Sequence, residues 1–472
     1  MRIPRVMIAA PGSGSGKTMV TCALLQALQD SGTQAVSFKC GPDYIDPMFH
    51  EKIIGVPSKN LDTFFTDEEQ TKRLFLKDRT ENDFAVLEGV MGLYDGLGGV
   101  RPEGSSYHLA CVTKTPIVLV ADVKGMGYSM IPLLSGFLQF DTEHLIQGVI
   151  LNRISGGFYK TMKPLVEETL KIPVAGYLPE KEEYRIGSRH LGLIMPDEIG
   201  DIKKTLRMAS EELQKTVSVD MIRNIAESAP EICAKTESWK ETTTRRGKAE
   251  GQVFCPDDRV NIGVAKDEAF CFYYEDNLRL LEEYGANIKC FSPLRDEGIP
   301  DDCHALLFGG GYPELYAKQL SENEKMRRAV RKASEDGMPI VAECGGFLYL
   351  HRSMTDREGN CYRMAGVVPA DCHDTGKSVR FGYISLREKH NFFLQENMEI
   401  KGHEFHYYDS TKNGKDAVAK KPATGRTYSC MMIDETHWMG FPHVYYPSNP
   451  AFAEALVEKA KKFCCILRSI RI

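Results

Sequence analysis

The sequence predicts an α/β protein of two units, the first of which is a doubly wound, mostly parallel sheet. Three observations indicate this class. Short apolar runs alternate with longer helical patterns, as is typical of parallel strands buried on both faces. A glycine- and serine-rich loop follows the first apolar run. After a polar stretch near the middle of the 472 residues, a second α/β series begins, and each half is long enough to bury its own core.

We place the first unit at residues 1–225. The helical patterns between its apolar runs imply right-handed crossovers. In open sheets of this kind, ligands lie beyond the carboxyl ends of the strands. The strands of this unit are expected at Arg5–Ala9, Ala35–Lys39, Phe84–Glu88, Ile117–Asp122 and Gly148–Asn152.

Residues 226–259 are polar and charged with little periodicity, which indicates an exposed linker. The second unit is placed at residues 260–472. Beyond Cys361 its pattern becomes more β-like and rich in turns, and a helix is expected from about Pro450. Its first strands are expected at Asn261–Ala265, Ile288–Phe291, Ala305–Phe308 and Ile340–Glu343.

Composition excludes several classes of protein. The formal net charge is -6, whereas a sequence-independent nucleic-acid binder is usually basic, so we expect no nucleic-acid partner. No stretch approaches the ~20 apolar residues of a membrane helix, and the first residues do not form a signal peptide. The 14 cysteines include no C-x-x-C pair, which favours reduced thiols. A cytoplasmic protein without a membrane partner is therefore expected.

The first functional motif is the phosphate-binding loop MIAAPGSGSGKT, residues 7–18. Its glycines let backbone N–H groups curl around phosphate oxygens, and the helix that follows adds the positive end of its dipole. The lysine reaches the β- and γ-phosphates, and the threonine hydroxyl suits Mg²⁺. Pro11 stands where the usual pattern has glycine. The residues expected to bind ATP are Gly12, Ser13, Gly14, Ser15, Gly16, Lys17 and Thr18.

Two acidic loops follow neighbouring strands, FKCGPDYIDPMFH at residues 38–50 and EGVMGLYDG at residues 88–96. Phosphoryl transfer needs metal ligands and charge-neutralising groups at that edge. Thr18, Asp43 and Glu88 are the candidate Mg²⁺ ligands, and Lys39 is the candidate cation for the transferred phosphoryl group. An aspartate in such a loop is also common as a simple turn cap.

The second functional motif is IVAECGGFLYL, residues 340–350, a strand-to-helix elbow that exposes a nucleophile, Cys344. The helix that follows is expected to favour the thiolate. The upstream FGGGYPE offers the backbone N–H groups of Gly310 and Gly311, with Gly345 of the elbow, as an oxyanion hole. His443 is the best candidate base. Its competitors are two residues of GHEFHYY, His403 and His406.

These motifs carry a family resemblance. The chain resembles the cobyrinic acid a,c-diamide synthase family over nearly its full length. Its first half is also similar to dethiobiotin-synthetase-like P-loop proteins, and its second half to class I glutamine amidotransferases of the cobyrinate and cobyrate synthase branch. The matching stretches are SGSGKT, GPDYIDPMFH, EGVMGLYDG, GVILNRI, SRHLGLI, AECGGFLYL, GHEFHYY and the final SNP.

The resemblance implies that ATP phosphorylates the a- and c-acetate side chains of a cobyrinate-type corrinoid. Ammonia from L-glutamine then displaces phosphate. It also implies Cys344 as nucleophile and His443 as its activator. Metal or substrate roles follow for Asp43, Tyr44, Asp46, Glu88 and Asp95, of which we assign Asp43, Tyr44, Asp46 and Asp95 to the substrate.

The chain departs from the pattern at Tyr445. The family often has a second histidine there, and many class I amidotransferases have an acid there that orients the catalytic histidine. We therefore expect a Cys–His dyad, or an orienting group from elsewhere.

The motifs fit more than one substrate and more than one oligomeric state. The substrate could be a metal-free hydrogenobyrinate or a nickel-sirohydrochlorin, and the protein could form a homodimer. A P-loop regulatory ATPase with a degenerate amidotransferase domain is a hypothesis of a different class, and Cys344, its glycines and His443 argue against it.

Overall fold

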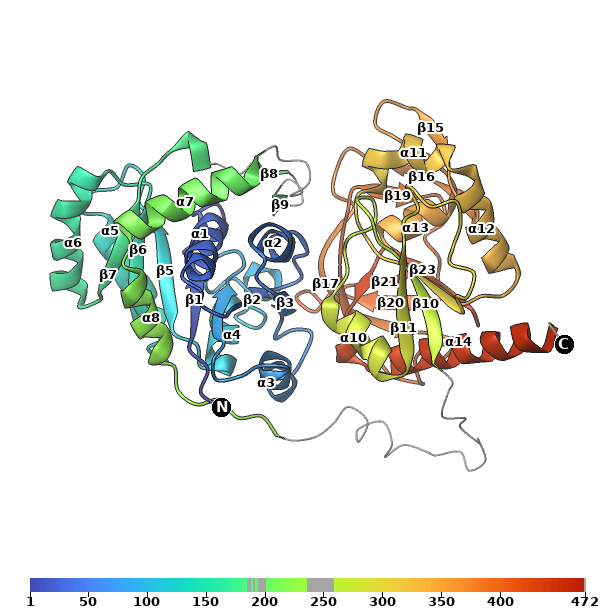
Figure 1. Cartoon of the computed structure of the whole chain (residues 1–472), viewed down its shortest axis with the longest axis horizontal. Coiled ribbons are helices and arrows are strands. Elements are labelled where there is room, and N and C mark those ends of the chain that lie inside the picture. The colour runs from blue at the N-terminus through green and yellow to red at the C-terminus, as the bar shows by residue number, and fades with distance from the viewer. Residues whose placement is uncertain (185–187, 190–191, 194–200, 236–258, 471–472) are drawn as a thin grey trace. The chain divides into compact units, whose positions relative to one another are not determined.

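The computed structural model describes residues 1–184, 188–189, 192–193, 201–235 and 259–470. The chain divides into two compact units, Met1–Thr236 and Glu237–Ile472. Of the predicted linker, residues 236–258 lie outside the described part. Figure 1 shows the two units, the first in blue to green and the second in yellow to red.

The first unit is built on a seven-stranded sheet with the order β3-β2-β4-β1-β5-β6-β7, and every neighbouring pair in it is parallel. The strands are almost wholly buried, as their apolar sequences require. The predicted doubly wound sheet is confirmed, and the structure adds β3 and β7, one at each edge. The strands are β1 (Arg5–Ala9), β2 (Ala35–Cys40), β3 (Ser58–Leu61), β4 (Phe84–Glu88), β5 (Ile117–Asp122), β6 (Ile146–Asn152) and β7 (Val174–Leu178).

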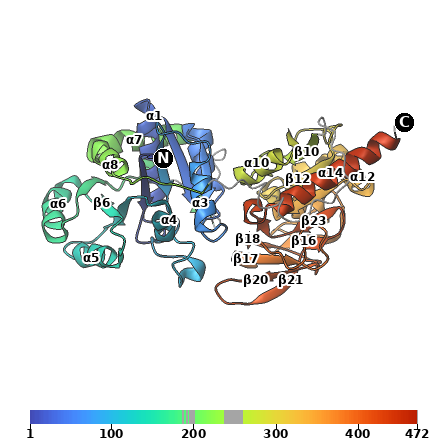
Figure 2. The ribbon, with the colours of Figure 1, turned by 90° about the horizontal axis from the view of Figure 1, so that it is seen from below.

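Helices cover both faces of this sheet. In Figure 2, α1, α7 and α8 lie on one side of it, and α4 and α5 lie on the other. A short pair, β8 (Ser188–Arg189) and β9 (Gly192–Leu193), lies outside the main sheet. The helices are α1 (Lys17–Asp30), α2 (Ile45–Met48), η1 (Phe49–Ile54), α3 (Glu68–Leu76), η2 (Leu97–Gly99), α4 (Ser106–Thr113), α5 (Met130–Phe140), α6 (Gly156–Leu170), η3 (Glu182–Tyr184), α7 (Ile202–Thr216) and α8 (Val219–Glu227).

The second unit has a central six-stranded sheet with the order β11-β10-β12-β13-β23-β22, parallel except for the edge pair β22 and β23. This confirms the expected α/β series, and the strands after Cys361 form the β-rich part that was also expected. The strands of the central sheet are β10 (Val260–Ala265), β11 (Ala286–Phe291), β12 (Ala305–Phe308), β13 (Ile340–Glu343), β22 (Met432–Ile433) and β23 (His437–Gly440).

Two further sheets complete this unit, with the orders β15-β14-β16-β19 and β21-β20-β17-β18-β24. Their strands are β14 (His351–Thr355), β15 (Cys361–Arg363), β16 (Val368–Asp374), β17 (Arg380–Glu388), β18 (Ile400–His406), β19 (Tyr408–Ser410), β20 (Ala417–Lys420), β21 (Thr427–Cys430) and β24 (His443–Val444). The helices of the unit are α10 (Glu275–Glu283), η5 (Pro313–Tyr316), α11 (Ala317–Glu322), α12 (Glu324–Glu335), α13 (Gly345–Leu350), η6 (Tyr446–Ser448) and α14 (Ala451–Ile470).

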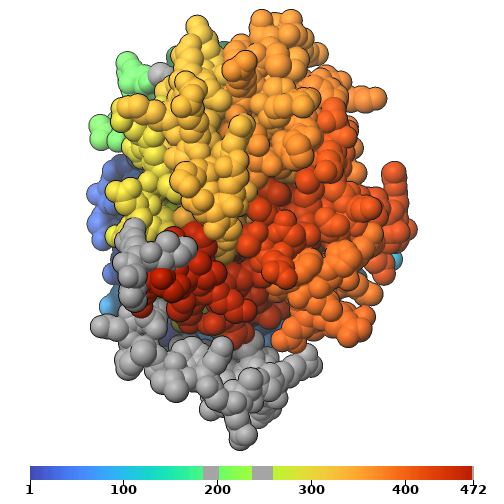
Figure 3. Space-filling model, turned by 90° about the vertical axis from the view of Figure 1, so that its right-hand side faces the viewer, coloured from blue at the N-terminus to red at the C-terminus, as the bar shows by residue number. Residues whose placement is uncertain are grey.

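The final helix, α14, closes one side of the core of the second unit. Phe452, Leu456 and Val457 on this helix are buried against the strands of the central sheet. Figure 3 shows α14 in red at the surface, between yellow and orange segments of the same unit. None of the helices in the described residues is long and apolar enough to cross a membrane.

Candidate active sites

The phosphate loop joins the end of β1 to the start of α1. Gly14 and Gly16 have φ values of 76° and 90°, a backbone region that glycine adopts without strain. A side chain on Gly16 would collide with the amide of Asn152, which donates to the Ser15 carbonyl at 2.8 Å. Arg153 reaches the Gly14 carbonyl at 3.4 Å. The end of β6 therefore holds the loop, a role that we did not predict, although GVILNRI marked this segment.

The Lys17 side chain lies between the phosphate loop and the loop that follows β4. Its Nζ donates to the carbonyls of Gly12 at 3.2 Å and Met91 at 2.6 Å. Burial, and then the nearby Lys39, lower the pKa of Lys17 to about 8. A phosphate would replace these carbonyl partners with negative charge and so stabilise the ammonium form.

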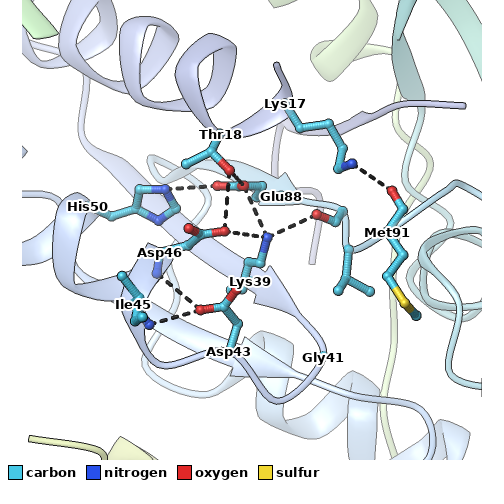
Figure 4. A network of polar contacts seen from close by, with 12 residues as sticks. Lys17, Thr18, Lys39, Gly41, Asp43, Ile45, Asp46, His50, Glu88 and Met91 are labelled. Atoms are coloured by element: carbon cyan, nitrogen blue, oxygen red, sulfur yellow. Dashed lines mark hydrogen bonds and ion pairs between the residues drawn. The ribbon is translucent and has the colours of Figure 1, made fainter. Parts of the chain in front are cut away.

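A buried ion network lies beside the loop, below α1 (Figure 4). The Lys39 ammonium is 2.6 Å from Asp46 Oδ2 and 3.0 Å from Glu88 Oε1. The Thr18 hydroxyl donates to Glu88 Oε1 at 2.7 Å and lies 3.4 Å from Asp46 Oδ2. The ends of β2 and β4 and the start of α1 thus bring a cation, a hydroxyl and two carboxylates together.

The charges of this network stabilise one another. Burial opposes the charge on Lys39, but Asp46, Glu88 and Asp43 outweigh it and raise the pKa of Lys39 well above its usual range. Burial also opposes the Glu88 charge, but Lys39 and His50 lower the pKa of Glu88. Burial and two neighbouring carboxylates raise the pKa of Asp46. Of the two acids beside Lys39, Glu88 therefore holds its negative charge more firmly.

His50 is a further member of the network that we did not predict. Its Nε2 lies 3.1 Å from Glu88 Oε2, and its Nδ1 lies 2.9 Å from Ser37 Oγ and 3.2 Å from Ser58 Oγ. The side chain is fully buried in η1, a π-helical turn. The position of His50 at the end of GPDYIDPMFH was the signal in the sequence, because that motif surrounds the site.

Asp43 occupies a different place from Asp46. Its Oδ1 accepts the backbone N–H groups of Ile45 at 2.9 Å and Asp46 at 3.2 Å, so it caps the turn that begins α2. Thr18 is close to Asp46 and Glu88 instead. Within the described residues, no cluster of three His, Cys, Asp or Glu side chains is arranged to hold a metal ion. Mg²⁺ commonly uses only one or two carboxylates together with phosphate oxygens and water.

Two more predicted substrate residues lie in the same two loops. Asp95 Oδ2 accepts the Gly92 N–H at 2.9 Å, which fixes the turn after β4, and Asp95 favours the charged form of Lys17. Tyr44 is buried at the start of α2. These loops therefore present backbone and carboxylate groups around the phosphate loop.

The thiol of the second unit lies at a strained elbow between β13 and α13. Cys344 has φ 46° and ψ -103°, a conformation that a non-glycine residue adopts only where surrounding structure imposes it. A side chain on Gly345 would lie 2.9 Å from Pro313 Cδ and 3.0 Å from the backbone nitrogen of Gly311. A side chain on Gly346 would collide with the Phe308 carbonyl. The two glycines thus let the elbow approach the FGGGYPE loop.

The elbow does not favour a resting thiolate, contrary to our expectation. Burial, and then Glu314, raise the pKa of the Cys344 thiol, and the N–H of Gly345 only partly offsets this. Helix α13 has six residues, so its dipole is small. The thiol therefore needs a base to remove its proton.

His443, the predicted base, lies against the FGGGYPE loop. A side chain on Gly310 would collide with the ring of His443, so the imidazole lies against the FGGGYPE loop. The Cys344 N–H donates to the Gly440 carbonyl at 2.8 Å, three residues before His443. Burial, and then His406, lower the pKa of His443 to about 3, so the resting ring is neutral.

The two competing histidines have other partners. His403 stacks on His443 with ring centroids 4.9 Å apart, and its Nδ1 lies 3.2 Å from the Tyr274 hydroxyl. His406 stacks on Phe441, and its Nδ1 donates to the Tyr408 carbonyl at 2.7 Å. Of the three, His443 lies against the predicted oxyanion glycines.

Comparisons with known proteins give a family match for each half of the chain. Residues 6–194 match the CobQ/CobB/MinD/ParA nucleotide binding domain, and residues 261–434 match the CobB/CobQ-like glutamine amidotransferase domain. The chain is 37% identical over 461 residues to cobyrinate a,c-diamide synthase of Caldanaerobacter subterraneus subsp. tengcongensis, covering 97% of this chain and 98% of that protein.

A second relative and one solved structure complete the comparison. The chain is 38% identical over 465 residues to cobyrinate a,c-diamide synthase of Listeria innocua, covering 97% of this chain and 100% of that protein. PurLQS from Thermotoga maritima is 17% identical with a TM-score of 0.32, over 44% of this chain and 100% of that chain.

Proposed function

The chain belongs to the cobyrinate a,c-diamide synthase family, and from this premise we propose that it converts the a- and c-acetate carboxylates of cobyrinate into amides. It is a glutamine-dependent amide-forming ligase with a nucleotide-binding unit and an amidotransferase unit. The observation that carries the proposal is this pairing of a phosphate loop with an acidic network in one unit, and of a cysteine elbow with a buried histidine against the FGGGYPE loop in the other.

In the first unit, a carboxylate oxygen of the substrate attacks the γ-phosphorus of ATP, and ADP leaves. Residues 12–18 bind the phosphates through backbone N–H groups. Lys17 exchanges its carbonyl partners for phosphate oxygens. Ammonia then attacks the acyl phosphate, the bond to phosphate breaks, and the amide forms. Tyr44, Asp46 and Asp95 are the residues that we assign to the substrate side of this reaction.

Mg²⁺ fits the oxygen donors of the network. The Thr18 hydroxyl and Glu88 Oε1 are 2.7 Å apart, and Asp46 Oδ2 is 3.4 Å from the same hydroxyl. Thr18 and Glu88 would hold the ion, with Asp46 or Asp43 as a further ligand. The ion would neutralise charge on the phosphates. Lys39 already balances the two carboxylates, and we assign it to the transferred phosphoryl group.

In the second unit, His443 takes the proton of the Cys344 thiol, and the sulfur attacks the carboxamide carbon of glutamine. The backbone N–H groups of Gly310, Gly311 and Gly345 hold the oxyanion. The C–N bond breaks, ammonia leaves with the proton from His443, and water then releases glutamate from the thioester.

The test is the product formed from each of three substrates. Cobyrinate, hydrogenobyrinate and nickel-sirohydrochlorin are incubated separately with ATP, Mg²⁺ and glutamine, and the products are analysed by mass spectrometry. We expect two carboxylate-to-amide mass changes on cobyrinate. The same changes on only one of the other two substrates would replace the cobyrinate assignment. ATP hydrolysis without any amide or glutamate would indicate a regulatory ATPase instead.

A further inference from the structure

Glu343, the residue directly before the nucleophile, lies beside the catalytic histidine. Its Oε2 is 3.8 Å from His443 Nδ1, and its Oε1 accepts the backbone N–H of Val444 at 3.2 Å. The side chains of both Glu343 and His443 are almost fully buried. One carboxyl group of β13 thus reaches both the ring and the backbone of β24.

Related amidotransferases carry an acid two residues after the catalytic histidine, where it orients the imidazole. In this chain that position does not supply an acid. Tyr445, two residues after His443, turns its hydroxyl to Asp276 and donates to Oδ2 at 2.8 Å. His403 covers one face of the His443 ring, so it sets the plane of the ring but does not approach it edge-on. Glu343 supplies a carboxylate oxygen at the edge of the ring, on the Nδ1 side.

We propose that Glu343 is the positioning residue of the glutaminase site, replacing the acid that is missing at Tyr445. This inference rests on the proposed glutaminase function of Cys344 and His443. Glu343 accepts the Nδ1 proton and leaves Nε2 facing the thiol. A distance of 3.8 Å is long for a hydrogen bond, but catalytic contacts commonly shorten when substrate binds.

A positioning carboxylate matters because His443 becomes positively charged during the reaction. When His443 takes the thiol proton, an imidazolium forms in a buried site, where an unpaired charge is costly. A carboxylate at Nδ1 stabilises that cation. Burial raises the pKa of Glu343 to about 8, so its carboxylate forms as the pH rises through that value. Titratable groups near Glu343 include Cys344, Tyr273 and Tyr446, and those near His443 include His403 and His406.

Glu343→Gln separates this role from a structural one. The glutamine side chain keeps a carbonyl oxygen for the Val444 N–H but replaces the oxygen that faces His443 with an NH₂ group, which cannot accept a proton. We expect glutaminase kcat to fall by about 10²- to 10⁴-fold, with little change in KM for glutamine. The rise of kcat/KM with pH that follows Glu343 ionisation should also disappear.

The pH dependence of Cys344 alkylation by iodoacetamide, read from the Cys344 peptide by mass spectrometry, gives a readout independent of turnover. It should change in Glu343→Gln. The matched control is Glu388→Gln, because Glu388 is equally buried and accepts three backbone N–H groups at residues 392–394. That control should lower the melting temperature but keep both pH profiles.

The outcomes are distinguishable. If Cys344→Ser still hydrolyses glutamine at the normal rate, the proposed glutaminase function itself fails. If Cys344→Ser is inactive and Glu343→Gln keeps normal kcat and pH profiles, only the positioning role is overturned. A loss of kcat and melting temperature in Glu343→Gln with unchanged pH profiles of turnover and alkylation would show a structural residue, and would also overturn the proposal.

Discussion

Each unit places a strand-to-helix turn at its predicted site, and the electrostatic surroundings of the two turns are opposite. In the first, β1 passes through a glycine loop into α1, and the neighbouring side chains are ionised: Lys39 is paired with Asp46 and Glu88. In the second, β13 passes through Cys344 into α13, and burial favours the neutral thiol and the neutral imidazole of His443. The strand-to-helix turn therefore brings backbone close to a ligand, while the surrounding charges decide which chemistry follows.

In each site a glycine also lies against a side chain from a distant segment. Gly16 lies against Asn152 at the end of β6, and Gly310 lies against His443 of β24. The first contact involves the predicted phosphate-binding backbone, whereas the second involves the predicted base. If the two sites are as separable as this comparison implies, single substitutions should disable one and spare the other.

The largest expected effect is that of Cys344→Ser. A serine hydroxyl beside a histidine of low pKa is a far weaker nucleophile than the thiol, so glutamine-dependent amide formation should fall by roughly 10³-fold or more. Synthesis from ammonium salt should remain, because in our proposal the acyl phosphate forms in the other unit. Glutamate release and diamide formation are measured with each nitrogen source. Loss of the ammonia-dependent reaction in a folded protein would mean that the sites are not separable.

Lys17→Met should have the opposite effect, with amide formation lost and glutaminase activity kept. The methionine keeps the buried stem and removes the ammonium that faces the phosphates, so amide formation should fall by about 10²- to 10³-fold with either nitrogen source. Glutaminase activity should remain measurable. ATP consumption and glutamate release are followed in the same samples. Full amide formation by this variant would remove Lys17 from the phosphate site.

A smaller effect is expected from Gly310→Ala, whose new methyl group would collide with the His443 ring. Overpacking of this kind costs about 1–3 kcal/mol, which corresponds to about 5- to 160-fold if it falls wholly on the glutaminase rate. Gly136→Ala is the matched control, because nothing lies within 4 Å of its added carbon. Ammonia-dependent synthesis should be normal in both variants. Equal glutaminase rates in the two would contradict the placement of His443.

The smallest effect is the acid sensitivity of the second unit. Burial lowers the pKa of His351 to about 4 and that of His443 to about 3, below the ~6.5 of an unfolded histidine. Their contribution to stability is full above about pH 6.5 and is lost as the pH falls toward those values, by up to about 1.4 kcal/mol per pH unit for each. The loss of stability is measured by hydrogen exchange of peptides from residues 259–470 between pH 7 and pH 5. The slope should be smaller in His351→Gln, and an equal slope would contradict the assignment.

Local patterns predicted much of this molecule because they depend on neighbours in the chain. The phosphate loop, the cysteine elbow and most strands of both central sheets followed from apolar runs and glycine spacing. Edge strand β3 was missed because SKNL is short and mostly polar. The thiolate expectation at Cys344 was wrong because it considered the helix that follows but not the burial of the sulfur.

The sequence by itself determined the fold class, the family and the two reactive motifs, since each rests on residues adjacent in the chain. Only the tertiary structure decided which distant side chains face those motifs. It placed Asp46 rather than Asp43 beside Thr18, and it placed His50 beside Glu88. It also placed Asn152 against the phosphate loop and Glu343 next to His443. The physical reason is that parallel strands bring together residues far apart in the sequence, and burial there changes the stability of every charge.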